Sequence, residues 1–396
     1  MEEDKKDNNG YEAEGSPLVG LVRDKFQQAE TSKVYDEKRW LKAYRNYRGL
    51  YGPEMAFREN EKSRVFVKIT KTKVLASFGQ IIEVLFSQVK FPLGVSPTSI
   101  PEDIAKRASL KPKEQQQPSM NPYGFNGDGA QIPPGATVND LMKNLNQEYE
   151  NVGFKEGPSY TGGPQIEPAR LAAEAMQKIL HDQLEESKAI TILRHVFFEM
   201  TLLGTGILKG PFTDLKEYNS FDTGEDDNGN LINVNIKKVK TIPSIEAVSC
   251  WDFYPDPNAT NINDCDYVIQ RHSYNKQQFQ DLAEKPMFNS DAVMECLEMG
   301  PNYQTRGFES SLYDRENIQT IYKNRFEVLE YWGIIDKKTA DECGLVYEAT
   351  GDVVAVNVWI CGNKVLRMVE NPFTPTRIPY LVCPYELNPY QFFGVG

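Results

Sequence analysis

"EPARLAAEAMQKILHDQLEESKAITILRHVFFEMTLLGTGILKG" (residues 167–210) contains the strongest helical pattern of the chain and the point at which that pattern ends. Pro168 suits the first turn of a helix, and apolar residues then recur at helical spacing in two ridges separated by polar residues near Glu185. We therefore expect two helices, or one long bent helix, that bury this side. The ridges are formed by Leu171, Ala175 and Ile179, and by Ile192, Val196 and Met200.

Beyond Gly206 the apolar period falls to that of a strand. Residues 230–239 alternate apolar and polar, and the Asn-Gly pair at 228–229 is typical of a tight hairpin. A short helix is expected within 273–283. Further strands are expected at 265–271, 326–335, 345–348, 353–361, 364–369 and 378–383. Helices followed mainly by strands predict an α+β chain with at least two modules.

Two helices are expected near the N-terminus. In residues 38–52 four aromatic residues share one helical face, and Gly49 or Gly52 ends the helix before Pro53. Residues 70–92 predict an amphipathic helix that packs on the core and stops before Pro92. The aromatic face consists of Trp40, Tyr44, Tyr47 and Tyr51, and the second ridge of Val74, Phe78, Ile81, Leu85 and Val89.

Charge is unevenly distributed along the 396 residues, whose net charge is -12. Residues 33–73 hold twelve Lys or Arg against five Asp or Glu, so an N-terminal basic region is joined to an acidic remainder. The first fifteen residues lack the apolar core of a secretory signal and are expected to form a disordered acidic tip. Because no run of eighteen apolar residues occurs, no membrane span is expected.

Composition divides the chain into five segments. Residues 92–168 are rich in Pro and Gly, which predicts a surface excursion or linker, with one helix expected at 137–149. The predicted segments are a flexible acidic tip (1–32), a basic helical region (33–91), the Pro/Gly-rich excursion (92–168), an α+β region (169–325) and a β-rich region (326–396).

Sequence motifs offer little chemistry, and we expect no enzyme activity, no cofactor and no metal. The six cysteines include no CxxC pair, and His181, His195 and His272 have no motif partner. The Gly-rich run at 204–210 follows a helix and enters a strand, the reverse of the order in a phosphate-binding loop. Its glycines are expected to end the helix and let two backbones approach.

One enzymatic alternative is a nuclease in which two carboxylates hold Mg²⁺ and a lysine positions water. Pro255-Asp256 and Asp336-Lys337-Lys338 supply the residue types of a PD…(D/E)xK motif. About eighty residues separate them, and the first pair lies in a Pro-rich turn, which disfavours this assignment. A DNA-binding protein that uses the basic N-terminal region is the related alternative.

Two longer segments resemble the portal proteins of tailed bacteriophages, especially short-tailed ones. In "VSCWDFYPDPNATNINDCDYVIQRHSYNKQQFQDLA" (248–283) a Trp-Asp-Phe is followed by an Asp-Pro turn, a strand and a helix, as in the wing of that family. "RIPYLVCPYELNPYQFFGVG" (377–396) resembles the stretch that precedes a long helix in portal proteins. Residues 45–86 also resemble the opening of podophage-type portals.

The resemblance implies a structural virion protein with a portal-like fold. Residues 169–325 would form a wing-like region and 326–396 a clip or stem-proximal region, with the channel helices partly beyond the chain end. It also implies a dodecameric ring at one capsid vertex, assembled in the host cytoplasm, that passes double-stranded DNA during packaging and ejection. Its partners would be the major capsid protein, the large terminase subunit and tail adaptor proteins.

Two sets of residues are candidates for contact with partners. A basic set lies largely off the aromatic face of 38–52 and either contacts DNA or another partner, or is the solvated side of a packed helix. An aromatic set in the β-rich region either anchors an interface or fills a local core. The basic set is Arg39, Lys42, Arg45 and Arg48, and the aromatic set is Trp332, Trp359 and Phe373.

Overall fold

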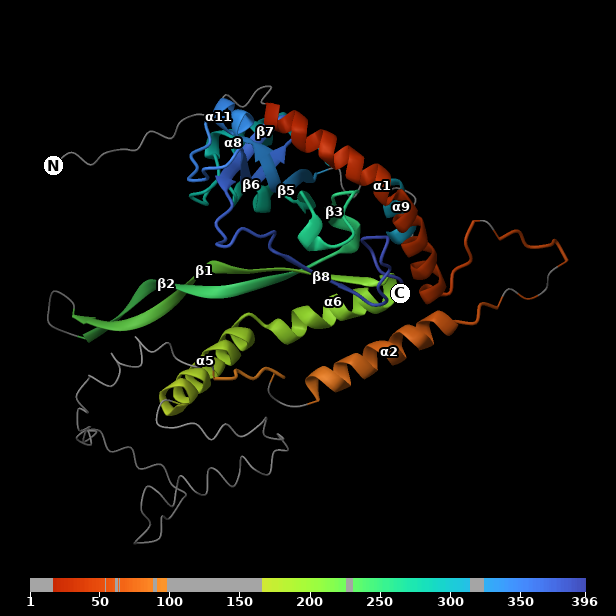
Figure 1. Ribbon diagram of the computed structural model, residues 1–396, viewed down its shortest axis with the longest axis horizontal. Coiled ribbons are helices and arrows are strands. Elements are labelled where there is room, and N and C mark those ends of the chain that lie inside the picture. Colours follow the sequence, from red (N-terminus) through yellow and green to blue (C-terminus); the bar gives the residue numbers. More distant parts are fainter. Residues whose placement is uncertain are drawn as a thin grey trace, which may run out of the picture. The chain divides into compact units, whose positions relative to one another are not determined.

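The computed structural model describes residues 17–53, 55–60, 63, 65–87, 91–97, 166–225, 231–313 and 324–396 (Figure 1). Helices and strands are both abundant among these residues, which confirms the predicted α+β class. The chain divides into two compact units, one formed by 1–92 with 181–396 and the other by 93–180. The helix expected at 137–149 lies outside the described residues.

Helix α1 (Pro17–Arg48) is longer than the sequence predicted. Its end is as expected, because Gly49 adopts a φ of 80° and its N–H donates to the Arg45 carbonyl at 2.9 Å. Its beginning corrects the assignment of residues 17–32 to a flexible tip. Leu18 and Val22 are fully buried, so the apolar spacing in this segment serves a packed helix.

Five antiparallel strands form the main sheet, in the order β3-β4-β5-β6-β7. They are β3 (Phe253–Pro255), β4 (Tyr267–Tyr274), β5 (Phe326–Asp336), β6 (Val353–Cys361) and β7 (Lys364–Glu370). Four strand predictions are confirmed, but the one at 345–348 is wrong. Leu345 N–H donates to the Ala340 carbonyl, which closes the end of helix α11 (Lys337–Glu342), and Glu348 N–H donates to a side chain.

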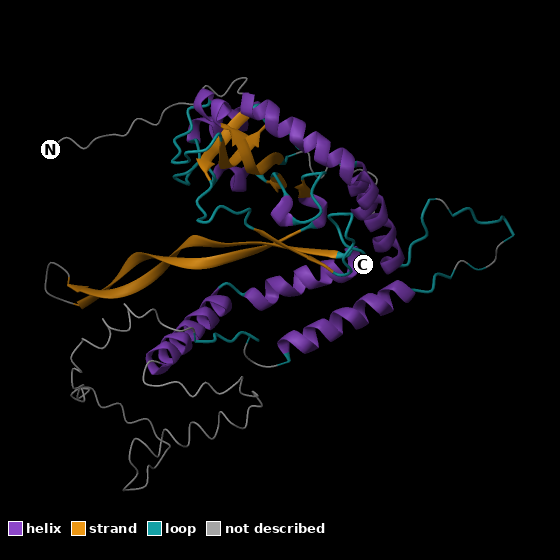
Figure 2. Ribbon diagram, in the orientation of Figure 1, coloured by secondary structure: helices purple, strands orange, loops and turns teal. Residues whose placement is uncertain are grey.

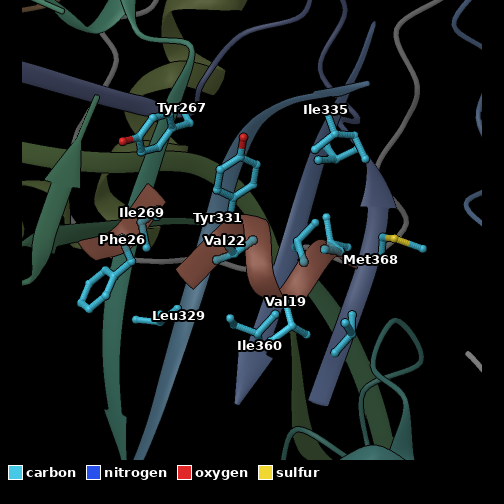
Figure 3. Close-up of a cluster of buried hydrophobic side chains, with 14 of the residues drawn as sticks. Val19, Val22, Phe26, Tyr267, Ile269, Leu329, Tyr331, Ile335, Ile360 and Met368 are labelled. Carbon is cyan, nitrogen blue, oxygen red and sulfur yellow. The ribbon is translucent and has the colours of Figure 1, made fainter. Parts of the chain in front are cut away.

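Helices cover both faces of this sheet. The first half of α1 crosses one face, where Val19, Val22 and Phe26 pack against residues of β4 to β7 (Figure 3). Helices α7 (Lys276–Gln280) and α8 (Ser290–Met299) pack on the other face through Phe279 and Val293. Alternation along β5 explains the two cores, since Leu329 and Tyr331 face α1 while Phe326 and Val328 face α7 and α8. Odd-numbered and even-numbered residues of β5 therefore belong to different cores.

A second sheet is dominated by one long hairpin (Figure 2). Strands β1 (Thr205–Glu225) and β2 (Leu231–Val248) pair from Ile207↔Val248 to Glu225↔Leu231, which confirms the predicted hairpin. Its turn lies outside the described residues. Strand β8 (Tyr380–Pro384) pairs with β1 only along residues 205–209.

The helices directly before the hairpin are two separate elements, which is one of the two arrangements that the sequence left open. Lys188, with a φ of 55°, separates α5 (Ile166–Glu186) from α6 (Ala189–Leu203), which confirms two helices. Helix α2 (Ile69–Phe86) contacts α6 and α1. Val74 of its predicted ridge is buried, and Phe78, Ile81 and Leu85 are half-buried. The helix ends at Phe86 rather than just before Pro92, and Val89 lies outside the described residues. No helix among the described residues has the length and apolar character that crossing a membrane requires.

A third core joins the hairpin to α1, α6 and the main sheet. It contains Trp40 of α1, Leu203 of α6, Ile207 of β1 and Trp332 of β5. At its edge two backbones meet, since a Cβ on Gly204 would lie 2.5 Å from the Gly394 carbonyl oxygen. The prediction that glycines of 204–210 end a helix and permit close backbone approach is confirmed.

Candidate functional site

A buried carboxylate, Glu330 of β5, lies where the hairpin meets the main sheet. Lys209 Nζ of β1 lies 2.5 Å from Glu330 Oε2, and His272 Nε2 of β4 lies 2.7 Å from the same oxygen. Trp332 Nε1 donates to Glu330 Oε1 at 2.7 Å. Although burial opposes its charge, the Lys209 ammonium and the hydrogen bonds from His272 and Lys209 lower the pKa of Glu330 to about 2.

Aromatic rings enclose the ammonium group of Lys209. Its Nζ lies 5.7 Å from the ring centroids of Trp359 and Tyr380 and 5.8 Å from that of Phe212. Lys209 is 6% exposed and Glu330 is 1% exposed, so this ion pair is shielded from water. Such a pair fixes geometry, because separating its charges in an apolar surrounding is costly. The root of the hairpin is therefore held to the main sheet at a defined position.

A second charged cluster, centred on Arg271 of β4 next to His272, attaches α9 (Gly307–Tyr313) and α1 to the main sheet. Arg271 donates to Glu309 Oε1 at 3.0 Å and to Glu327 Oε2 at 3.2 Å. Arg306 pairs with Glu327 and with Glu30 of α1, the latter at 2.7 Å. These carboxylates are thus occupied by arginine forks that connect separate elements.

Two further ionisable groups are buried with partners of their own. Burial lowers the pKa of Lys33 to about 8, and its Nζ donates to the Trp251 carbonyl at 2.6 Å. Burial raises the pKa of Glu199 to about 7, and this carboxyl accepts a hydrogen bond from Ser249 Oγ. Lys33 connects α1 to the short 3-10 helix η1 (Cys250–Asp252), and Glu199 connects α6 to Ser249, the N-cap residue of η1. Their contacts are structural links between elements.

The residue types of the nuclease alternative lie in separate elements, Asp256 in the turn after β3 and Asp336 at the end of β5. Within the part of the chain that the structure describes, no group of three or more His, Cys, Asp or Glu side chains could hold a metal ion. Asp256 is buried, and its Oδ1 accepts the Asn258 N–H at 3.0 Å within the turn. Asp336 precedes α11, and Lys338 pairs with Glu342 along that helix.

The four predicted basic residues divide into two pairs on α1. Arg39 donates to Asp36 and to the Gly394 carbonyl, and Arg45 donates to Ser311 Oγ at 3.1 Å. Lys42 and Arg48 are exposed, and Arg48 also lies 5.8 Å from the Tyr44 ring. Thus Arg39 and Arg45 hold the fold together, and Lys42 and Arg48 keep an outward position.

Two of the three predicted aromatic residues come together, but in the core. Trp332 is 3% exposed and lies 6.1 Å from Phe373 and 6.2 Å from Phe212 at the root of the hairpin. Trp359, 9% exposed, stacks on His272 at 5.0 Å on the same sheet. Both tryptophans therefore lie in the core, as the second of the two predicted alternatives has it, because strand alternation directs them inward. Phe373 is half-buried.

Sequence reasoning missed the charged residues that position the hairpin. Glu330 stands in the apolar run of β5, and Lys209 follows two apolar residues of β1. A charge inside an apolar strand is the signal that could have identified a buried pair. The identity of each partner depends on which strands are neighbours, and this information comes only from the topology.

The arrangement of long hairpin, five-stranded sheet and C-terminal strand lies within one continuous match to a known family. Residues 160–396 match the family described as the phage SU10 portal protein, which is more than half of the chain. The chain belongs to this portal family. A search of curated proteins returned no significant match to the sequence.

Membership of the portal family defines the general class of the protein. It is a phage portal protein, a virion component of a structural rather than an enzymatic family, and such proteins assemble as oligomers. The match includes the hairpin, the Glu330 cluster and the main sheet. Helices α1 and α2, with the exposed Lys42 and Arg48, precede the matched residues, so a partner for these residues stays a prediction.

Proposed function

We propose that copies of this chain form the ring-shaped portal at one vertex of a phage capsid. Double-stranded DNA passes through the ring during packaging and ejection, and the ring serves as a docking platform for the terminase and the tail proteins. The match of residues 160–396 to a portal family carries this proposal. A dodecameric ring, assembled in the host cytoplasm and built into the virion, is the form expected for such a function.

Charge supports a conduit rather than a strong DNA binder. The chain carries a net charge of -12, although residues 33–73 hold twelve Lys or Arg against five Asp or Glu. Each phosphate that a protein neutralises adds affinity through counterion release. A predominantly acidic body therefore keeps DNA mobile in a channel, because it offers few sites at which phosphates are held.

Native mass spectrometry of the purified chain, with negative-stain images of the same sample, tests the proposal. We expect a ring of about twelve copies with a central hole, in keeping with closed cyclic symmetry. A monomer or dimer at micromolar concentration would overturn the proposed ring. The images also separate a ring with a channel from a compact oligomer that lacks one.

A DNA contact by α1 is a second candidate, favoured by the exposed positions of Lys42 and Arg48. The test is DNA affinity measured across a range of salt concentration for Lys42→Glu/Arg48→Glu. A matched control is Lys338→Glu on α11, whose side chain is 87% exposed. If α1 contacts phosphates, only the double variant loses affinity and salt dependence. Equal behaviour of both variants would exclude this contact.

A further inference from the structure

Beyond Phe212 the β1–β2 hairpin has few supporting contacts among the described residues, and one of them is the ion pair of Lys240 with Glu186 of α5. Strand β8 pairs only with residues 205–209, and Phe212 is the last hairpin residue that packs on Trp332 and Phe373. Farther out, the described residues 213–216 and 236–241 are all exposed. A two-stranded ribbon of this kind is marginally stable in water without a further strand or a covering element.

Both faces of the ribbon carry apolar side chains. Directly paired residues share a face, so the register places Leu215, Val239 and Phe221 on one side. These three are 66%, 59% and 74% exposed. Tyr218 and Ile236 lie on the opposite side and are 46% and 39% exposed. A free strand edge beside exposed apolar residues is typical of a surface that pairs with another chain.

The two strands of the ribbon differ in charge. Residues 211–225 contain four acidic residues and one lysine, and residues 231–245 contain three lysines and no acidic residue. Within a hairpin β1 and β2 present opposite outer edges. One edge of the ribbon therefore lies along an acidic strand and the other edge along a basic strand.

In a ring with rotational symmetry, the acidic and basic edges of neighbouring hairpins would face each other. In a cyclic ring each subunit contacts the next through two different surfaces, so one edge of a hairpin faces the other edge of its neighbour. The basic β2 of one copy then meets the acidic β1 of the next, and opposite charges across adjacent strands attract. Adjacent hairpins pointing the same way also place β2 antiparallel to the neighbouring β1, which allows the ladder to continue.

We propose that the outer hairpin, residues 211–225 with 231–245, is the arm by which one copy of this chain binds the next in the ring. The β2 edge of one subunit pairs with the β1 edge of its neighbour, and the apolar residues of the ribbon become covered in the assembled ring. This inference rests on the proposed ring and names the surface that closes it.

The first test measures assembly of Leu215→Asp/Val239→Asp by native mass spectrometry over a concentration series. Both side chains are exposed in the single chain, so the substitutions spare its core. The concentration for half assembly is expected to rise at least about a hundredfold, since two apolar contacts are replaced by buried charges. Val346→Asp, at a position 89% exposed outside the hairpin, is the matched control and should assemble as wild type. Circular dichroism of each variant verifies the fold.

The second test uses rings assembled from a mixture of isotope-labelled and unlabelled chains. A zero-length carbodiimide joins lysines to adjacent carboxylates, and mass spectrometry then identifies the joined peptides. We expect crosslinks between the lysine-rich peptide of β2 and the acidic peptide of β1 that contain one labelled and one unlabelled chain. Crosslinks between these peptides found only within one chain would overturn the proposed pairing.

The outcomes separate the arm from the ring itself. Absence of a wild-type ring would overturn both the proposed ring and the arm. A wild-type ring that Leu215→Asp/Val239→Asp forms equally well would overturn the arm alone. Unchanged assembly with lost DNA retention, or with lost binding of another virion protein, would assign the ribbon to that partner and likewise overturn the subunit contact.

Discussion

Replacing Glu330 by Gln tests whether the buried charge cluster holds the hairpin to the main sheet. The change keeps the shape of the side chain but removes the negative charge that Lys209 and His272 contact. The pKa of Glu330 falls from its ordinary value of 4.5 to about 2, which corresponds to about 3 kcal/mol of stabilisation at neutral pH. We therefore expect Glu330→Gln to lower the free energy of unfolding by about 3 kcal/mol, because Lys209 is left buried without its counterion.

The pH dependence of this loss has a defined sign. A folded-state pKa below the unfolded value means that the contribution of Glu330 is present above about pH 4.5 and is lost as pH falls towards 2. The difference in unfolding free energy between wild type and Glu330→Gln should therefore shrink through this interval. Urea titration of the dissociated chain, followed by tryptophan fluorescence, measures it, since Trp332 donates to this carboxylate.

A double-mutant cycle isolates the ion pair. Lys209→Met and the double variant Lys209→Met/Glu330→Gln complete the cycle, and a coupling energy of at least about 1 kcal/mol is expected for groups in direct contact. The control is Glu342→Gln, which removes the exposed pair with Lys338 and should cost less than about 0.5 kcal/mol. A cost of Glu330→Gln no greater than that of the control, or one that does not change with pH, would refute the reasoning.

Three further substitutions test other links in the fold by the same urea titration. Gly204→Ala should cost at least about 2 kcal/mol, since Gly204 has a φ of 95° and a Cβ would clash with the Gly394 carbonyl; an unchanged midpoint would contradict this. Because burial raises the pKa of Glu199 to about 7, its charged form destabilises the fold as pH rises from 4.5 through 7. The free energy of unfolding of Glu199→Gln should thus exceed that of wild type by about 3 kcal/mol at pH 8 and match it near pH 4, whereas a constant difference would exclude the titration. Arg271→Lys should cost about 2 kcal/mol because lysine cannot donate to two carboxylates at once in the same geometry, and a neutral effect would show that the fork is dispensable.

Local patterns were sufficient to predict most elements. The strands at 353–361 and 364–369 were found because a run of apolar and β-branched residues predicts a buried strand whichever elements cover its faces. The helix break at Lys188 and the end of α1 at Gly49 followed from polar and glycine signals within a few residues. The first half of α1 was missed because its acidic neighbours obscured a helical apolar spacing that is only completed by packing on the main sheet.

Partner choice over long distances could not be predicted from the same patterns. Lys209 and Glu330 are 121 residues apart, and their contact depends on how the hairpin is seated on the sheet. Tryptophan is a residue type common in interfaces, yet the side chains of Trp332 and Trp359 are buried inside the protein. Arg39 and Arg45 looked like free cations, but each donates to a segment more than 260 residues away in sequence. A single sequence does not specify such pairs.

The hairpin is constructed differently at its two ends, and this difference suits a subunit arm. At the root, Lys209, Phe212 and the pairing with β8 fix the direction of the ribbon before any partner arrives. An arm whose direction is already fixed loses little conformational freedom when it binds, so more of its contact energy contributes to assembly. A fixed root also imposes one angle between successive subunits, and a constant angle is the condition for a ring that closes. We therefore expect substitutions at the root to alter ring size or closure, and substitutions in the outer ribbon to alter the affinity between subunits.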